Sequence, residues 1–403
     1  MKKVVFSILV IILLLTTSFK ENETLSIMTM TTEKSEVKIY LFGSGTCTIE
    51  WGDGTVVTVT LLPIGSAPTE TKSHVYDNAS KHIITVKGGT ITGVSCTENQ
   101  LTSLDVSKNP ALTNFNCSDN QLTSLDLSKN TALKDLDCGY NQLTVLDMSN
   151  NLALTSLSCN VNEQLTNLNV SKNTLLKELY CGDNQLTSLD VSNNTELAHL
   201  LCPNTQITSL DVSKNTMLRR LYCQKNQLTS LDISKNTDLR ELDIVDNQLT
   251  SFDVSKNTAL TGFSCSGNQL SSLDISKNIA LTDLVCGQNQ IASLDLSKNT
   301  LLANLNCNEN QLISLDLSKN IMLRWVSFEN NNMEATALNA LFGTLHDKEI
   351  MDSFWGVVAQ KELHINENPD FDGLSSYPLP PIFSMGALRG FRFVVVSVSK
   401  LIF

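Results

Sequence analysis

Cysteine is the residue type in this sequence whose spacing most suggests chemistry. Ten of the eleven cysteines recur in one register of 21 residues, with one 22-residue step around Glu163. Such a column could bind a metal ion, form disulfides, or serve as small apolar side chains in a core. The ten cysteines are Cys96, Cys117, Cys138, Cys159, Cys181, Cys202, Cys223, Cys265, Cys286 and Cys307.

A repeat positions these cysteines. Its pattern is L-x-x-L-x-C-x-x-N-Q-L, as in Leu133, Leu136, Cys138, Asn141 and Leu143, and it runs through eleven consecutive units from Cys96 to Ser327. The second half of each unit carries a near-copy of the same spacing. The pattern resembles the leucine-rich repeat, and its nested 10- and 11-residue pieces resemble the short class of bacterial leucine-rich repeats.

The fold class predicted from this pattern is mainly β, a leucine-rich-repeat solenoid of about eleven 21-residue coils. Alternating apolar residues, as in residues 136–138 and 125–127, point inward, and equivalent strands of successive coils pair in parallel. No unit contains a helical pattern. The convex side of the coils is therefore expected to be extended as well.

The cysteine column is interpreted as core packing. Ile244 and Phe328 occupy the same register, so the position accepts any apolar side chain of fitting size. Neighbouring coils lie about 4.8 Å apart, but parallel Cβ vectors on adjacent strands suit a disulfide poorly. A linear ladder does not converge four sulfurs on one metal ion. Disulfides and metal binding remain as alternatives, and Cys47 has no evident partner.

Asparagines form two further columns, which we expect to bond backbone groups at the bends. Thr205 replaces the asparagine once in the first column, beside Pro203. The first column is Asn99, Asn120, Asn141, Asn162, Asn184, Asn226, Asn247, Asn268, Asn289 and Asn310. The second runs without exception from Asn109 to Asn320.

A column of aspartates faces outward in the second half of the units, from Asp105 to Asp316. Calcium binding is one interpretation. Lysines three residues later, such as Lys108 and Lys129, offset the repulsion between these carboxylates, and the glycine-rich loop of a calcium-binding β-roll is missing. The sequence therefore predicts a charged surface column, and no metal site or cofactor.

Two segments precede the repeats. Residues 1–18 resemble a signal peptide, with Lys2 and Lys3 before an apolar run that is short for a membrane span. An uncleaved membrane anchor is the alternative. Residues 29–92 alternate like strands, and "WGDGT" followed by "HVY" and "IITVKG" resembles PKD-type β domains of extracellular proteins. There we expect Asp53 to close a tight turn and Trp51 to pack, without a ligand.

The predicted repeat domain covers residues 93–332, and residues 333–403 are predicted to form a C-terminal cap and tail. Met333, Ala337, Leu338, Leu341, Phe342 and Leu345 fall on one helical stripe that suits a cap. The family resemblance implies such a cap. A proline-rich turn and the β-prone segment from Phe391 to Val398 follow.

Enzyme and nucleic-acid functions find little support. The five histidines stand in different segments without metal spacing, and neither a nucleophile elbow nor a phosphate loop is present. A site in residues 346–403 is a remote alternative. The net charge of −12 and the pI near 4.9 argue against a nucleic-acid partner, since phosphate binding needs clustered lysine and arginine.

Exposed positions differ between the two halves of the units. Those of the second half are almost constant as Thr, Ser, Asp, Ser and Lys, whereas those flanking the cysteine change at nearly every unit. Large side chains that favour binding are frequent there. The candidate ligand-binding residues are Tyr140, Tyr180, His199, Arg219, Arg220, Tyr222, Arg240 and Trp325.

These observations predict a secreted or cell-surface recognition protein that binds a protein or glycan through the leucine-rich-repeat face. The predicted protein is not an enzyme, and it meets a membrane only if residues 1–18 stay uncleaved. A passive structural surface protein without a specific ligand is the alternative.

Overall fold

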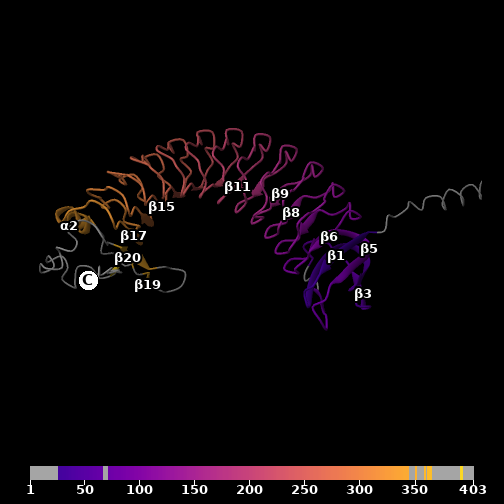
Figure 1. Cartoon of the computed structure of the whole chain (residues 1–403). Helices are drawn as coiled ribbons and strands as arrows, with labels where there is room; N and C mark the ends of the chain where they lie inside the picture. Colours follow the sequence, from indigo (N-terminus) through magenta and orange to yellow (C-terminus); the bar gives the residue numbers. More distant parts are fainter. Residues whose placement is uncertain are drawn as a thin grey trace, which may run out of the picture. The chain divides into compact units, whose positions relative to one another are not determined.

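The computed structural model describes residues 26–66, 71–344, 350–351, 358–359, 361–364 and 391–393. The chain divides into two compact units, residues 1–133 and residues 134–403. The predicted signal peptide lies outside the described residues. Figure 1 shows the course of the chain.

The first unit is built around a long central strand. Strand β2 (Glu36–Glu50) pairs antiparallel with β3 (Val56–Thr60), β4 (Lys72–Val75) and β5 (His82–Ser95). The other side of β5 pairs antiparallel with β1 (Ile27–Thr32). Long strands form here because alternate residues are apolar and face one core.

The end of β5 begins a parallel ladder within the first unit. Its last three residues pair in parallel with β7 (Asn114–Asn116), while β6 (Ser103–Asp105) pairs antiparallel with β1. The register between β2 and β5 shifts after Phe42, which marks a bulge in β2. At Gly43 (φ 153°) a Cβ atom would lie 1.9 Å from the carbonyl oxygen of Thr90, so only glycine fits.

The turn after β2 is held by the residues that the sequence singled out. Trp51 is buried, and the Asp53 carboxylate accepts the amide hydrogen of Thr55 at 2.9 Å, as expected. The sequence did not reveal that His74 stacks on Trp51 and lies 2.6 Å from the other Asp53 oxygen. Tyr76 donates to the carbonyl of Trp51 at 2.6 Å. The PKD-like character of this segment stays a prediction.

Asp53 is expected to make the first unit sensitive to acid. The Thr55 amide and His74 lower the pKa of its carboxyl from 3.8 to about 2. A folded-state pKa below the unfolded one stabilises the fold above about pH 4, and this contribution is lost as the pH falls towards about 2. The backbone amides of β5 should therefore exchange hydrogen faster in Asp53→Asn than in wild type at pH 5, and the difference should shrink by pH 2. Hydrogen exchange of β5 measures this; a difference independent of pH contradicts it.

The second unit contains ten three-residue strands that pair in parallel in chain order. Within this unit they follow one another on the inner side of the stacked coils, and the turns lie on the outer side (Figure 1). The strands are β8 (Asp135–Asp137), β9 (Ser156–Ser158), β10 (Glu178–Tyr180), β11 (His199–Leu201), β12 (Arg220–Tyr222), β13 (Glu241–Asp243), β14 (Gly262–Ser264), β15 (Asp283–Val285), β16 (Asn304–Asn306) and β17 (Trp325–Ser327).

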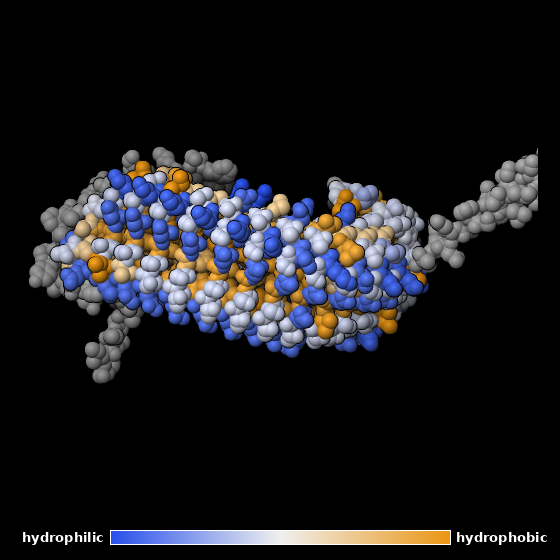
Figure 2. Space-filling view, turned by 90° about the horizontal axis from the view of Figure 1, so that it is seen from above, coloured by the Kyte–Doolittle hydropathy of each residue, from blue (hydrophilic) through white to orange (hydrophobic). Residues whose placement is uncertain are grey.

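This arrangement confirms the predicted fold class, a solenoid of about eleven coils with parallel strands. Each side-chain position recurs once per coil, so rows of hydrophilic and hydrophobic residues run from coil to coil (Figure 2). In every strand from β8 to β17 the middle residue is buried and the first is not.

The prediction of strands in the aspartate half is wrong for the described part of this unit. The apolar triplets there, such as residues 210–212, form no strand, apart from one parallel bridge between Asp147 and Asn169, and turns follow them, as at residues 213–214 and 216–217. The coil at Asp211 shows the reason: its carboxylate accepts the Ser213 amide hydrogen at 2.8 Å, and the Asn215 amide bonds to the Val212 carbonyl at 3.0 Å. Amides used in local turns cannot extend a ladder. The aspartates thus close turns, a role that the sequence did not reveal.

Asparagines hold neighbouring coils together, as predicted. Asn268 Nδ2 donates to the carbonyls of Cys265 and Ser266 in its own coil and to that of Ile244 in the preceding coil. Its Oδ1 accepts the Leu249 amide hydrogen at 3.0 Å. The second column acts similarly, since Asn257 Nδ2 reaches carbonyls one coil back.

All eleven cysteines lie in the described residues, are buried and form no disulfide. The ten of the repeat column are 0–1% exposed, as expected for core side chains. Burial raises the pKa of the Cys202 and Cys286 thiols to about 12, so at neutral pH the reactive thiolate is scarce.

We therefore expect native protein to react slowly with a thiol reagent, and denatured protein to titrate with nearly all eleven thiols free. Titration with and without denaturant, on protein taken from its native compartment, measures this. Mass spectrometry that finds neighbouring repeat cysteines linked would contradict it.

The helix predicted beyond the repeats is present as α2 (Ala335–Thr344). Met333, Leu338 and Leu341 are fully buried, whereas Leu345 lies outside the described residues. Further on, β18 (Ile350–Met351) pairs with β19 (Val358–Ala359). Strand β20 (Lys361–His364) extends the parallel ladder from β17, and β21 (Phe391–Phe393) pairs with β20.

Candidate functional site

The candidate site is the exposed side of the parallel strands in the second unit, which we call the strand face. It consists of the first and third residues of strands β8 to β17, because the middle residue points into the core. The first row is Asp135, Ser156, Glu178, His199, Arg220, Glu241, Gly262, Asp283, Asn304 and Trp325. The third-residue row is Asp137, Ser158, Tyr180, Leu201, Tyr222, Asp243, Ser264, Val285, Asn306 and Ser327.

An ion pair organises the centre of the strand face. Arg220 on β12 and Glu241 on β13 are paired residues of adjacent strands. The guanidinium donates to both carboxylate oxygens, from Nε at 2.7 Å and from Nη2 at 2.9 Å. Tyr222 also donates its hydroxyl to Glu241, and the Arg220 guanidinium lies 5.8 Å from the Tyr222 ring centroid.

These contacts shift the pKa values of the cluster. Hydrogen bonds from Arg220 and then Tyr222 lower the pKa of Glu241 to about 2, and the carboxylate in turn raises the pKa of Arg220. Burial, followed by the bond to Glu241, raises the pKa of Tyr222 to about 12. The charged pair therefore persists at physiological pH and holds the tyrosine in one orientation.

A second cluster lies on strands β9 to β11. Glu178 accepts hydrogen bonds from Tyr180 at 3.2 Å and from Ser156 at 3.3 Å. The His199 Nδ1 atom lies 3.5 Å from the other Glu178 oxygen. Burial raises the pKa of Tyr180, with the negative charge of Glu178 adding to the effect. A tyrosine that donates its hydroxyl to a glutamate thus occurs twice, at Tyr180 and, two coils further on, at Tyr222.

The predicted ligand-binding residues divide into three groups. Tyr180, His199, Arg220, Tyr222 and Trp325 lie on the strand face. Arg219 and Arg240 are exposed and directly precede β12 and β13.

Tyr140 lies off the strand face, in the bend after Cys138, where φ is 53° and the side chain is 57% exposed. Each neighbouring coil has one residue of positive φ at the equivalent bend, so a backbone requirement places Tyr140 there.

Choosing candidate binding residues by their type missed Glu178 and Glu241. These glutamates hold the side chains of Tyr180, Tyr222 and Arg220 in place by hydrogen bonds. The choice by type also missed Asp243 and Gly262. The two exposed positions beside the buried leucine could have identified all four, because they define the strand face without reference to chemistry.

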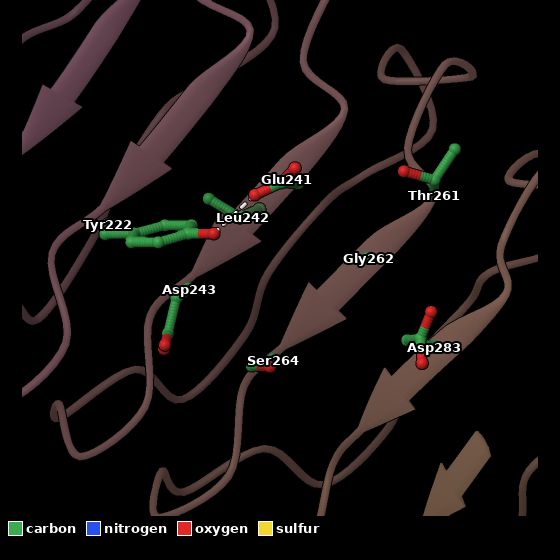
Figure 3. A pocket seen from close by; sticks show the side chains of 8 residues that line it. All are labelled: Tyr222, Glu241, Leu242, Asp243, Thr261, Gly262, Ser264 and Asp283. Carbon is green, nitrogen blue, oxygen red and sulfur yellow. Dashed lines mark hydrogen bonds between the residues drawn. The ribbon is translucent and has the colours of Figure 1, made fainter.

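A hollow opens on the strand face between β13 and β15 (Figure 3). Its volume is about 340 Å³. A Cβ atom on Gly262 would meet no atom within 4 Å. The lining residues are Tyr222, Glu241, Leu242, Asp243, Thr261, Gly262, Ser264 and Asp283.

Two carboxylates of the hollow lack a cationic partner among the described residues. Asp243 accepts the Val245 amide hydrogen at 3.1 Å, and burial raises the pKa of its carboxyl. Asp283 accepts hydrogen bonds from Asn304 at 2.5 Å and from Thr282 at 2.6 Å. Across the described part of the chain, no three His, Cys, Asp or Glu side chains are arranged to hold a metal ion.

Comparisons with known proteins agree with the fold. The family described as leucine-rich repeats (2 copies) matches residues 216–257. Among solved structures, the functional domain of InlJ from Listeria monocytogenes, which includes a cysteine ladder, is 35% identical with a TM-score of 0.61. That match covers 68% of this chain and 59% of the InlJ chain. No curated protein matches the sequence.

More distant structures show the fold alone. A leucine-rich-repeat protein of Leptospira interrogans is 22% identical with a TM-score of 0.58, covering 68% of this chain and 72% of its own. The internalin InlF from L. monocytogenes is 20% identical with a TM-score of 0.54, covering 75% and 86%. In the described residues of the present chain, helices of the length and apolarity needed to span a membrane are missing.

Proposed function

We propose that this leucine-rich-repeat protein, similar to bacterial proteins of the same fold, is a secreted or cell-surface recognition protein that binds a protein or glycan through the strand face. One observation carries the proposal. Exposed residues of the strand face differ from coil to coil, whereas the aspartate half repeats nearly the same Thr-Ser-Asp in each coil. A partner can distinguish one coil from the next only on the varied side.

The side chains of the strand face suit recognition. Tyrosine, arginine and tryptophan dominate binding energy at many protein interfaces, because they bury large areas at low entropic cost. Tyr180 and Tyr222 are both half-buried and hydrogen-bonded to glutamates before any ligand arrives. Pre-ordered side chains lose less entropy on binding than free ones do.

Export and domain organisation belong to the same proposal. Lys2, Lys3 and the apolar run after them support a signal peptide in residues 1–18. Residues 29–92 then act as a PKD-like N-terminal cap, residues 93–332 as the repeat domain, and residues 333–403 as the C-terminal cap and tail. The acidic net charge of −12 supports a partner other than nucleic acid.

Alanine substitutions on the two halves of the coils test where a ligand binds. The full chain is first used to isolate a partner from cell-surface extracts. Tyr180→Ala and Arg219→Ala are then expected to weaken the complex by about 2 kcal/mol or more each, as hot-spot truncations do. Calorimetry on the purified pair measures this change.

The matched controls are Thr187→Ala and Ser188→Ala, two exposed residues of the constant half. We expect them to leave affinity almost unchanged. If the controls weaken binding more than the strand-face variants while circular dichroism stays unchanged, the binding face is wrongly assigned. A passive structural role is the alternative, and it gains support if no extract yields a saturable partner.

A further inference from the structure

The geometry of the hollow at Gly262 points to a basic side chain, arginine or lysine, of a protein partner as its occupant. This inference rests on the proposed function and narrows it. It specifies that the partner is a protein, and it states which kind of side chain of that partner occupies the hollow.

Shape is the first argument. Gly262 lies between Glu241 and Asp283 in the first row of the strand face, paired with both. The glycine is not required by its backbone, because its φ is not positive and a Cβ atom would meet nothing within 4 Å. The equivalent position carries a side chain in every other strand from β8 to β17. Its absence here leaves a space about one side chain wide, since adjacent strands are about 4.8 Å apart.

Charge is the second argument. Three carboxylates line the hollow, and Arg220 neutralises one of them, Glu241. Within the described part of the chain, the carboxylates of Asp243 and Asp283 receive hydrogen bonds from neutral groups, namely the Val245 amide, Asn304 and Thr282. The Asp243 carboxylate is partly removed from water without a cation, which is costly, whereas Asp283 is exposed at the edge of the hollow. A cation entering the hollow would be attracted by the negative charge of both aspartates. An anionic ligand is disfavoured for the same reason.

The walls supply the third argument. Arginine and lysine have apolar stems that pack on apolar or aromatic surfaces while the charged end finds a partner. The Tyr222 ring offers such a surface beside the carboxylates (Figure 3). Tyr222 is held by its bond to Glu241, so the wall is formed before binding. A neutral sugar could bond to the hydroxyls of Thr261 and Ser264 but would leave the negative charge of both aspartates without a counter-charge.

A small-molecule titration of the full chain tests this directly. The probe is N-acetyl-arginine methylamide, and the control is N-acetyl-citrulline methylamide, which has nearly the same shape and no charge. We expect the arginine probe to bind at least about tenfold more tightly and to shift the Gly262 amide resonance. N-acetylglucosamine serves as the saccharide probe, and we expect it to leave that resonance unchanged.

Variants locate the contact. Gly262→Val, which fills the hollow, and Asp243→Asn, which keeps its shape, should each weaken the arginine probe at least about tenfold. The control is Thr187→Val, an exposed residue of the constant half of the coils, which should leave affinity unchanged. Equal binding of citrulline, unchanged affinity in Gly262→Val, or a preference of the hollow for the saccharide would each overturn the inference.

These outcomes are separable from those for the proposed function. A protein partner that needs Tyr180 and Arg219 but binds Gly262→Val as well as wild type would remove the inference and leave the proposed function standing. Binding of the arginine probe in the hollow, together with a partner insensitive to every strand-face substitution, would remove the proposed function and leave only the preference of the hollow for a basic group.

Discussion

Asn268→Ala is expected to lower the free energy of unfolding of the second unit by about 3–5 kcal/mol. The side chain bonds to four backbone groups in two coils: the carbonyls of Ile244, Cys265 and Ser266, and the amide of Leu249. Alanine leaves all four without this partner in an interior where Asn268 is 8% exposed. Each buried polar group left unpaired costs about 1–3 kcal/mol, and entry of water recovers part of the total.

Urea unfolding followed by circular dichroism measures the change. Gln269→Ala is the matched control, because Gln269 is the next residue, carries the same amide group and is exposed. Its effect should stay within about 0.5 kcal/mol. If both substitutions destabilise equally, the asparagine column does not hold the coils together, and its regularity in the sequence needs another explanation.

The features that the sequence predicted well share one physical property: each recurs along the stacked coils. The inward cysteine, which Ile244 and Phe328 replace in two coils, the apolar residue in the middle of each strand and the two asparagine columns all occupy core positions that stacking makes equivalent. At Thr205 the repeat is broken, and the fold adapts there: the hydroxyl donates to Asn226 Oδ1 at 2.5 Å and lies 3.4 Å from the Cys202 carbonyl.

The aspartate half shows where apolar alternation misleads. Leu210, Asp211 and Val212 alternate like a strand, and Leu210 and Val212 are buried as expected. The Asp211 side chain nevertheless captures the Ser213 amide and starts a turn. Alternation therefore predicted which side chains face the core. It did not predict that the segment fails to pair as a strand, because the bond from the Ser213 amide to Asp211 starts a turn directly after the alternating residues.

The candidate site was predicted only in part, because its order depends on residues of different coils. Tyr222 and Arg220 are recognisable by type, but their common partner, Glu241, lies 19 and 21 positions away from them, respectively, and is unremarkable in sequence. The hollow at Gly262 depends on a side chain that is absent, and only the strand register shows what surrounds it. A list of conspicuous residues lacks this register, which shows which residues of neighbouring coils lie side by side.

Deleting one whole coil is expected to preserve the fold, whereas deleting half a coil should disrupt it. Removing residues 290–310, a full 21-residue unit, joins Asn289 to Gln311 and restores the repeated Asn-Gln junction. Strand β15 can then pair with β17, and Asn331, which bonds to the Cys307 carbonyl, meets the equivalent carbonyl of Cys286. Every interface that remains is of the native kind, as nearest-neighbour stacking requires.

Removing only residues 300–310 joins Asn299 to Gln311 and places one aspartate half directly after another. Strand β16 is lost, and a turn-forming segment has to stand between β15 and β17. Asn320 loses its bonds to the carbonyls of Leu296 and Asn299, because these residues no longer lie one coil back. Several buried groups lose partners at once, so the loss of stability should exceed about 5 kcal/mol.

Circular dichroism and urea unfolding of the two deletion variants measure the difference. We expect the full-unit variant to keep its signal per residue, and the half-unit variant to lose signal and unfold at lower urea. The longer deletion should therefore be the milder one, which is the opposite of what a single compact core would show, since there the larger loss of buried surface is the more damaging. Equal loss of signal in both variants would mean that the coils are not independent stacking units.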